Sequence, residues 1–224
     1  MIKELQTGDL KCVCATQNNK NKVVYMIYPE IVPFKNEWLE DMASKYNTNL
    51  AVIYIPSDEW NDMLTPWPEP GETPDSPPFA GDAAKTLLQL QKVVIPSVEK
   101  TLDLPNNVTR NLIGVSLSGL FTLWQWLQSS IFSSVASLSG SFWYPGFIDW
   151  FEGQSIPQKS GMAYFLLGVK EPKAWIKEYR SVGINTEKIV SGLKSAGIAT
   201  EFSWVPGDHF TDPLERAELA LSKL

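Results

Sequence analysis

Residue types that commonly build metal and redox sites are scarce in this chain. Its 224 residues include one histidine and two cysteines, Cys12 and Cys14. A structural zinc site takes four ligands, and the chain has no further cysteine to supply a second pair. The two cysteines share one face of a predicted strand at 10–15, so we interpret them as buried structural thiols. No metal-ligand cluster or nucleotide-binding glycine loop occurs either, and we expect no cofactor.

An excess of basic residues is also missing. Lys and Arg number 19 against 25 for Asp and Glu, which gives a net charge of -6. This balance argues against nucleic acid as a partner, because its binding depends on Lys and Arg contacts to phosphate. No apolar run is long enough to span a bilayer, and residues 1–9 are too polar for a secretory signal. We therefore expect no nucleic-acid or membrane partner, and a cytoplasmic location.

Apolar segments of strand length alternate with segments of helical periodicity along the whole chain. Hydrophobic residues make up 44% and charged residues 20%, which is typical of a globular domain, so we predict a single domain over 1–224. The alternation predicts an α/β fold with a mostly parallel central sheet and helices on both faces. The predicted strands are 10–15, 23–28, 50–55, 112–115, 134–138, 163–167 and 200–205, and the predicted helices are 36–46, 82–102, 117–127, 175–196 and one that follows residue 212.

Two of these helices contain residues that disfavour a helix interior. Pro96 lies within 82–102 and should kink or split that helix, because proline has no N–H to donate to the preceding turn. Gly183 lies near the start of 175–196 and is expected to break that helix early. Both helices are therefore predicted to be interrupted.

The segment 56–81 departs from the alternation of strands and helices. Six of the thirteen residues from 66 to 78 are proline, so this stretch can be neither a helix nor a central strand. Loops of this length in compact domains are usually functional or disordered. We interpret the segment as a loop over the cleft that supplies Trp60 and Trp67 as apolar contact surface; the alternative is a surface loop stiffened by its prolines.

A serine sits where a predicted strand turns sharply into a helix. The sequence at 114–118 is Gly-Val-Ser-Leu-Ser, which differs from the Gly-x-Ser-x-Gly nucleophile elbow in its last residue. Such a turn is strained and needs small flanking residues, and Gly114, Ser118 and Gly119 meet that need. An ordinary turn is the alternative, but the apolar strand before it and the helix after it favour Ser116 as a nucleophile.

His209 is the one imidazole that could activate this serine, which is a poor nucleophile until a base removes its proton. It follows the strand 200–205 and precedes the last helix. That helix opens with Asp212 as its cap, Pro213 in its first position and Glu215 completing a capping box. In α/β-hydrolases the chain order is serine, acid, histidine, with the histidine after the last strand. This order predicts His209 as the catalytic base.

An acidic partner for the histidine is expected after the strand 163–167. Glu171 is the carboxylate in the turn that follows, and it would hold the imidazole in one tautomer. An exposed charge paired with a neighbouring lysine is the alternative. Asp149 is the reserve candidate, and Asp208 is too close in sequence to orient the ring of its neighbour. Glu171 is therefore predicted to be the acid.

Backbone N–H groups should stabilise the oxyanion that forms during ester cleavage. The N–H of Leu117 follows the nucleophile and opens the next helix. A second donor is expected from the loop after the strand 23–28, in which Pro29 and Pro33 have no N–H. The N–H of Glu30 or Ile31 could serve, and we predict Leu117 and Ile31.

Aromatic residues supply candidates for the substrate pocket. Trp60, Trp67, Trp143 and Tyr144 are the predicted pocket wall. Core packing is the alternative for each, since nine tryptophans in one domain cannot all line a cleft.

Four segments resemble a known group of enzymes. The Gly-Val-Ser-Leu-Ser-Gly-Leu-Phe at 114–121 resembles the elbow of bacterial α/β-hydrolases related to esterase D and the siderophore (enterochelin) esterases. The segments at 64–70, 139–146 and 206–210 resemble that group's Thr-Pro-Trp-Pro, Ser-Gly-Ser-x-Trp-Tyr-Pro-Gly and Pro-Gly-x-His-Phe sequences. The likeness runs from about residue 50 to the C-terminus and covers most of the chain.

The resemblance implies an α/β-hydrolase fold without a separate lid domain. It also implies Ser116 as nucleophile, Glu171 as acid and His209 as base. Two positions depart from the group. Ser118 stands where relatives have Gly or Ala, and Val169 stands where relatives often carry Asp. If that Asp is the acid of the family, Glu171 must substitute for it here.

These observations favour a serine esterase that cleaves small-molecule carboxylic esters through an acyl-enzyme. A non-catalytic ligand-binding protein of the same fold is the first alternative, supported by Val169 and by the glycine-poor oxyanion loop. An acyltransferase or peptidase with the same triad is the second. One fold hosts many chemistries, so the acyl and alcohol parts of the substrate stay open.

Overall fold

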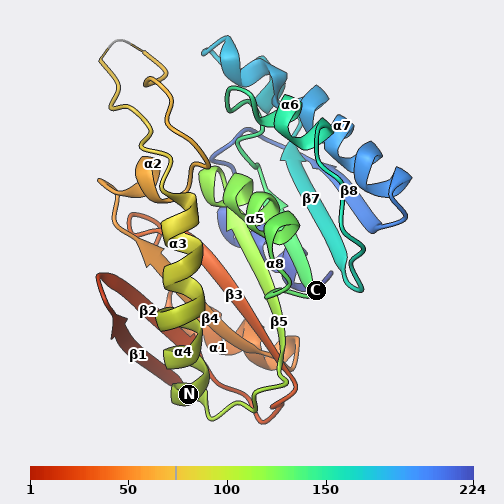
Figure 1. Cartoon of the computed structure of the whole chain (residues 1–224). Helices are drawn as coiled ribbons and strands as arrows, with labels where there is room; N and C mark the ends of the chain where they lie inside the picture. The colour runs from red at the N-terminus through yellow and green to blue at the C-terminus, as the bar shows by residue number, and fades with distance from the viewer. Residues whose placement is uncertain (74) are drawn as a thin grey trace. The chain divides into compact units, whose positions relative to one another are not determined.

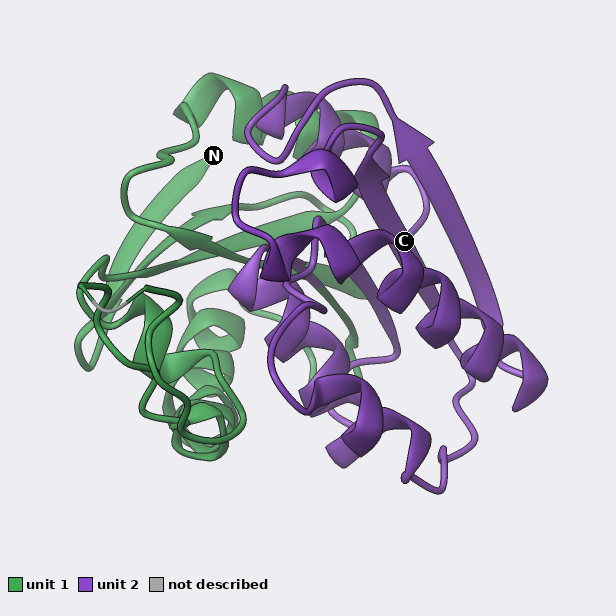
Figure 2. Ribbon diagram, turned by 90° about the horizontal axis from the view of Figure 1, so that it is seen from above, with its two compact units in different colours: residues 1–112 green, residues 113–224 purple. Residues whose placement is uncertain are grey.

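Two compact units make up the chain, Met1–Leu112 and Ile113–Leu224 (Figure 2). The computed structural model describes residues 1–73 and 75–224, and Pro74, which belongs to the predicted loop 56–81, lies outside them. Eight strands form one sheet in the order β1-β2-β4-β3-β5-β6-β7-β8 (Figure 1). β5 (Thr109–Val115) contains the boundary between the two units. The prediction of a single domain over 1–224 stays a prediction.

The first unit holds the antiparallel part of the sheet. β1 (Ile2–Thr7) pairs antiparallel with β2 (Leu10–Ala15), and β2 pairs antiparallel with β4 (Asn49–Ile55). β3 (Lys22–Pro29) runs parallel to β4. Every residue of β4 is buried, as expected for a strand covered on both faces.

The helices of the first unit lie on both sides of its strands. α1 (Asn36–Lys45) packs against β2 and β4, and α4 (Ile95–Leu102) packs against β1 and β2 from the opposite side (Figure 1). The remaining helices are α2 (Trp60–Met63), α3 (Ala83–Gln89) and the π-helix η1 (Leu90–Val94). Cys12 and Cys14 are buried and free, and burial raises the pKa of the Cys14 thiol to about 12. Such thiols stay protonated, which agrees with a structural role.

The second unit is built on parallel strands. β6 (Ser134–Leu138) pairs with β7 (Met162–Gly168), and β7 pairs with β8 (Ala199–Val205). β8 lies at the edge of the sheet, and all its residues are half-buried or exposed, as expected of an edge strand. α5 (Leu117–Gln128) and α8 (Pro213–Leu221) pack against β6 from opposite sides (Figure 1).

The remaining helices of the second unit follow β6 and β7. They are α6 (Phe147–Glu152), α7 (Val182–Ser195) and the short 3-10 helices η2 (Glu171–Lys173) and η3 (Glu178–Ser181). The predicted fold class is confirmed: the sheet is mostly parallel, and no separate lid domain is found over 1–73 and 75–224. No helix in these ranges is long and apolar enough to cross a membrane.

Several local predictions were incomplete or wrong. β1 and α6 were not predicted. The helix predicted over 82–102 is interrupted, as expected, and the π-helix η1 lies directly before Pro96, whose missing N–H disturbs the regular ladder. The prediction that Gly183 breaks a helix is wrong. Gly183 lies in the first turn of α7, where a Cβ would come within 3.0 Å of Pro172 Cγ and 3.2 Å of the Trp204 ring.

The capping box predicted at the last helix is also wrong. Asp212 has φ 47° and ψ 58°, a left-handed conformation, and its side chain makes no capping hydrogen bond. A cap residue normally has an extended backbone that lets its side chain reach the first N–H groups. Pro213 opens α8 as predicted, because its fixed φ suits the first helical position.

Candidate active site

Ser116 occupies the strained turn that the sequence predicts between β5 and α5. Its backbone has φ 56° and ψ -123°, a region that residues with a Cβ rarely adopt. Backbone hydrogen bonds hold the turn: Ser116 N–H donates to Leu138 O at 3.0 Å, and Ser141 N–H donates to Ser116 O at 3.0 Å. The serine is therefore anchored to the segment that follows β6.

Small residues around Ser116 let the chain turn this sharply. A Cβ at Gly114 would lie 2.1 Å from Ser118 O, and a Cβ at Gly119 would lie 2.8 Å from Ser137 Oγ. Ser118 is buried, and its hydroxyl donates to Val115 O at 2.8 Å and accepts from Val115 N–H at 2.7 Å. The serine at this position is thus accommodated by bonding to the end of β5.

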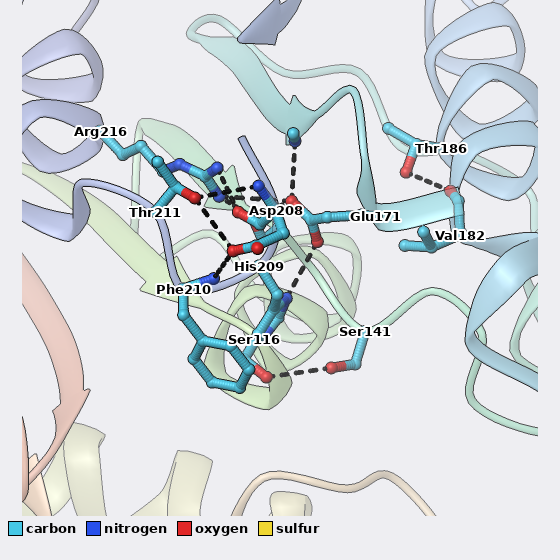
Figure 3. A network of polar contacts seen from close by, with 12 residues as sticks. Ser116, Ser141, Glu171, Val182, Thr186, Asp208, His209, Phe210, Thr211 and Arg216 are labelled. Carbon is cyan, nitrogen blue, oxygen red and sulfur yellow. Dashed lines mark hydrogen bonds and ion pairs between the residues drawn. The ribbon is translucent and has the colours of Figure 1, made fainter. Parts of the chain in front are cut away.

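His209 and Glu171 form a direct pair in the second unit, which also contains Ser116 (Figure 3). His209 Nδ1 lies 2.9 Å from Glu171 Oε2. The carboxylate side chain is 4% exposed and the imidazole 31% exposed. The acid is therefore enclosed in protein, whereas part of the ring faces solvent.

The other oxygen of Glu171 is held by three donors. Glu171 Oε1 accepts from Ser139 Oγ–H at 2.7 Å, from Gly168 N–H at 2.7 Å and from Arg216 Nη1 at 3.3 Å. Burial raises the pKa of Glu171, but the hydrogen bond and charge of His209 and the donors Ser139 and Gly168 outweigh it, so the pKa lies below its usual value. The carboxylate is therefore ionised and fixed in orientation.

The turn that carries His209 is closed by short-range hydrogen bonds. Asp208 Oδ1 accepts from Phe210 N–H at 3.1 Å and from the Thr211 hydroxyl at 2.9 Å, and that hydroxyl accepts from Asp208 N–H at 3.0 Å. Gly207 has φ 93°, and a Cβ there would lie 2.4 Å from Thr211. The Asp208 side chain therefore holds the turn that carries His209.

Ser116 Oγ bonds to another serine in this structure. It lies 3.3 Å from Ser141 Oγ, and over residues 1–73 and 75–224 no hydrogen bond joins it to His209 (Figure 3). Catalytic hydrogen bonds are often long in ligand-free structures and tighten when substrate binds. The buried Ser141 hydroxyl is thus a second polar partner of the nucleophile candidate.

The two competing acid candidates lie elsewhere. Asp149 is exposed on α6, and in the described part of the chain no ion pair or hydrogen bond links it to His209. Val169 is 48% exposed in the turn after β7. Glu171 is the carboxylate that the structure pairs with the imidazole.

The predicted oxyanion donors lie in different units. Leu117 N–H opens α5 directly after Ser116, among the N–H groups that have no partner within the helix. Ile31 is 77% exposed in the turn after β3, in the first unit. Glu30 N–H donates to Ile55 O at 3.2 Å and is already used. Of the two alternatives in that loop, Ile31 remains the predicted donor.

The four predicted pocket residues are divided between the units as well. Trp60 and Trp67 are half-buried in the first unit, at the start of α2 and in the proline-rich segment. Trp143 is half-buried in the second unit, with its ring 4.3 Å from the ring of Tyr179. Tyr144 is 2% exposed, which is what core packing would produce. The pocket itself stays a prediction.

Ser139, Ser141 and Arg216 bond to the predicted triad but were not singled out from the sequence. Ser139 and Ser141 lie in the Ser-Gly-Ser segment that carried the resemblance, so that likeness is the sequence feature that could have identified them as site residues. Arg216 is a charged residue on a helix, which ordinarily indicates a solvent-facing position. No group of three or more His, Cys, Asp or Glu side chains suited to a metal occurs over 1–73 and 75–224.

The sheet order, the strained serine turn after β5 and the histidine after the last strand define an α/β-hydrolase. A family model described as "Putative esterase" matches residues 29–182. The chain therefore belongs to this esterase family, a family of carboxylic-ester hydrolases, and the resemblance to the esterase D and siderophore esterase group is confirmed. The match includes Ser116 and Glu171, and His209 lies beyond it.

A curated relative and several solved structures are similar to the chain. The uncharacterized protein YbbA of Bacillus subtilis (strain 168) is 25% identical over 154 residues, which cover 68% of this chain and 62% of YbbA. The chain thus matches less than two thirds of that relative.

Two solved structures cover nearly the whole chain. The siderophore hydrolase EstB from Aspergillus nidulans has a TM-score of 0.70 and 17% identity, covering 99% of this chain and 93% of its own. An IroE-like serine hydrolase from Shewanella oneidensis has a TM-score of 0.76 and 14% identity, covering 99% and 79%. At these identities the likeness shows a shared fold.

Proposed function

We propose that the chain is a serine esterase in which Ser116, His209 and Glu171 act as nucleophile, base and acid. The 2.9 Å contact between His209 Nδ1 and Glu171 Oε2 carries this proposal. It places an ionised, buried carboxylate against the one histidine of the chain, in the unit that also holds Ser116. The strained backbone of Ser116 is the second support, because strain of this kind collects at functional sites.

The acid determines which nitrogen of His209 can act as the base. An ionised carboxylate accepts hydrogen bonds and cannot donate them, so Nδ1 must carry the proton in the pair with Glu171. Nε2 of the neutral ring then has a free lone pair. This nitrogen takes the Ser116 hydroxyl proton as Oγ attacks the ester carbonyl, and later donates it to the departing alcohol.

The reaction then proceeds through an acyl-enzyme. The bond between Ser116 Oγ and the carbonyl carbon forms, and the bond to the alcohol oxygen breaks. Water, deprotonated by His209, then attacks the acyl carbon, the bond to Ser116 Oγ breaks, and His209 returns the proton to Oγ as the carboxylic acid leaves. Leu117 N–H would stabilise the oxyanion, and a donor of this kind typically contributes about 2.7–4 kcal/mol.

The substrate class is a small-molecule carboxylic ester. The similar structures include one described as an enterobactin and salmochelin hydrolase, IroE, with 18% identity and a TM-score of 0.71. Siderophore esters therefore belong in the substrate screen beside aryl esters and simple acyl esters. A cytoplasmic location stays a prediction, and cell fractionation would test it.

Labelling with a fluorophosphonate probe tests the proposal without any assumption about the substrate. The probe should modify Ser116 in the wild-type chain, as located by mass spectrometry, and the adduct should be lost in His209→Ala and Ser116→Ala. Labelling at another serine would refute Ser116 as the nucleophile, and no labelling of folded wild-type protein would favour a ligand-binding protein of the same fold.

A further inference from the structure

Arg216 is a buried charge that the proposed reaction does not require. It lies on α8, and its side chain is 5% exposed. Removing a guanidinium from water costs several kcal/mol unless its N–H groups are bonded and its charge is paired. The partners of Arg216 are therefore the reason that it can be accommodated there.

Within the described part of the chain, the hydrogen bonds of the Arg216 guanidinium go to the surroundings of the acid and the base. Nη1 donates to Ser139 Oγ at 2.7 Å and to Glu171 Oε1 at 3.3 Å. Nη2 donates to the backbone oxygen of Asp208, the residue before His209. One rigid group thus ties the carboxylate to the turn that carries the imidazole (Figure 3).

The same arrangement shares one carboxylate between two N–H donors, the imidazole and a guanidinium. His209 is bonded to Oε2 of Glu171, and Arg216 is bonded to Oε1. A guanidinium is charged at any ordinary pH, so it offsets part of the negative charge that would otherwise stabilise an imidazolium. A neutral imidazole is the form that can accept the serine proton.

Two other charged groups belong to this environment. Asp208 is exposed in the histidine turn, and its pKa is lowered by the Thr211 hydroxyl and by Phe210 N–H, with smaller effects of Lys170 and Arg216. Lys170 is exposed beside Glu171. Both face solvent, which screens their effects on the ring. Arg216 is the buried cation in direct contact with the acid.

We propose that Arg216 is a positioning residue that orients Glu171 and the His209 turn and limits the negative charge acting on the imidazole. This inference rests on the proposed function, since it concerns the base of the same reaction. Its two parts make separate predictions: loss of the guanidinium shape affects orientation, and loss of the positive charge affects the titration of the ring.

The single histidine makes the test direct, because the ring protons of His209 give one set of histidine NMR signals. In Arg216→Met, the pH midpoint of these signals should rise, because a positive charge that offsets the charge of Glu171 is removed. The acidic limb of the kcat/KM profile should move with it. We expect kcat to fall about 10- to 100-fold, the range seen when groups that orient a site residue are lost, with little change in KM.

Arg216→Lys separates orientation from charge. An ammonium keeps the charge but cannot reproduce the planar fork that bridges Glu171, Ser139 and Asp208. Its His209 midpoint should stay near that of the wild type while kcat still falls. If Arg216→Met does not fold, Arg216→Lys decides the question, and unchanged kcat in that variant would refute the positioning role.

Arg110→Met is the matched control. Arg110 forms an ion pair with the buried Glu99 in the first unit and has no bond to the triad candidates. This variant should lose stability while the His209 midpoint and kcat stay unchanged. An equal change of the His209 signal in Arg110→Met and Arg216→Met would refute the inference.

Failure of the proposed function has a different signature. If Ser116 is not labelled by the fluorophosphonate but the His209 midpoint still rises in Arg216→Met, the charge effect stands and the esterase proposal falls. If Ser116 is labelled but the midpoint and kcat are unchanged in Arg216→Met, the esterase proposal stands and the role of Arg216 is refuted.

Discussion

Each compact unit contains a buried glutamate paired with an arginine, and the two pairs differ in their third partner. In the first unit, Glu99 is bonded to Arg110, and Tyr25 OH donates to Glu99 Oε1 at 3.2 Å. In the second unit, Glu171 is bonded to Arg216 and to His209. The side chains of the second pair are 5% and 4% exposed, against 23% and 11% for Arg110 and Glu99.

The third partner decides what each pair can do. Burial, reinforced by the charge of Glu99, raises the pKa of Tyr25, so this phenol stays a neutral donor at any ordinary pH. An imidazole, in contrast, can gain and lose a proton near neutral pH, and its second nitrogen is available to act as a base. A buried ion pair alone is weak evidence for function. An ion pair that orients a half-exposed histidine is the stronger signal.

Replacing the glutamate of each pair by glutamine should give the largest difference in kcat between the two pairs. Glu171→Gln removes the negative charge and can turn an N–H towards His209 Nδ1, which favours the wrong tautomer. We expect ester hydrolysis to fall about 10³- to 10⁴-fold, since the corresponding change in a serine protease costs about 10⁴. The measurement is kcat on an activated aryl ester.

Glu99→Gln is the control for that loss. It leaves Arg110 without its carboxylate and should reduce the free energy of unfolding by about 1.5–3 kcal/mol, the value of hydrogen bonds to charged groups. Its kcat should match the wild type. A comparable loss of kcat in both variants would mean that the activity reports stability and not the chemistry of Glu171.

Ser139→Gly should have a smaller effect on the same site. Ser139 has φ 49°, so glycine suits the backbone there while removing the hydroxyl that bonds to Glu171 Oε1 and Arg216 Nη1. Both bonds are lost, and the bond to the carboxylate alone, about 1.5 kcal/mol, corresponds to a fall of about tenfold in kcat/KM if it acts fully in the transition state. Ser139→Ala should be less stable than Ser139→Gly because of its φ. Unchanged kcat/KM in the glycine variant would show that this hydroxyl does not support the acid.

The parts of the fold that the sequence predicted are those with continuous apolar runs. β3 and β4 are buried along nearly their whole length, so their composition identifies them without any knowledge of their neighbours. β1 is mostly half-exposed and is held in the sheet by its pairing with β2. A pairing between strands depends on the tertiary structure, so the composition of β1 alone does not predict it. Asp212 adopts a left-handed backbone, and no local pattern distinguishes it from an ordinary cap.

The candidate site could be predicted for those residues that follow the chain order of the α/β-hydrolases. Ser116, Glu171 and His209 follow the order of the α/β-hydrolases, and the structure pairs the last two. Ser139 and Arg216 were not predictable, because they are defined by contacts between segments 77 residues apart. A helical arginine is usually solvated, and only its burial reveals the role that we infer.

Removing the third partner of the first pair should affect stability alone. Tyr25→Phe deletes the hydroxyl that bonds to Glu99, and the ring remains in the core. We expect a loss of about 1 kcal/mol in the free energy of unfolding, the typical net value of a hydrogen bond, with unchanged kcat. Denaturant unfolding measures the first quantity. A fall in kcat would mean that the two pairs are coupled, contrary to the comparison.

The smallest expected effect is the dependence of stability on pH. The pKa of Glu171 lies below its ordinary value of 4.5, so the folded chain favours the ionised form more than the unfolded chain does. Its contribution to stability is therefore complete above about pH 4.5 and is lost as the pH falls through the lower folded-state value. The difference in unfolding free energy between wild type and Glu171→Gln should accordingly shrink as the pH is lowered from neutrality to values below about 4.5. Because burial opposes the lowering and His209 is the largest favourable cause, His209→Ala should weaken this trend. A difference that stays constant over this range would show that the acid is not held in its ionised form by the histidine.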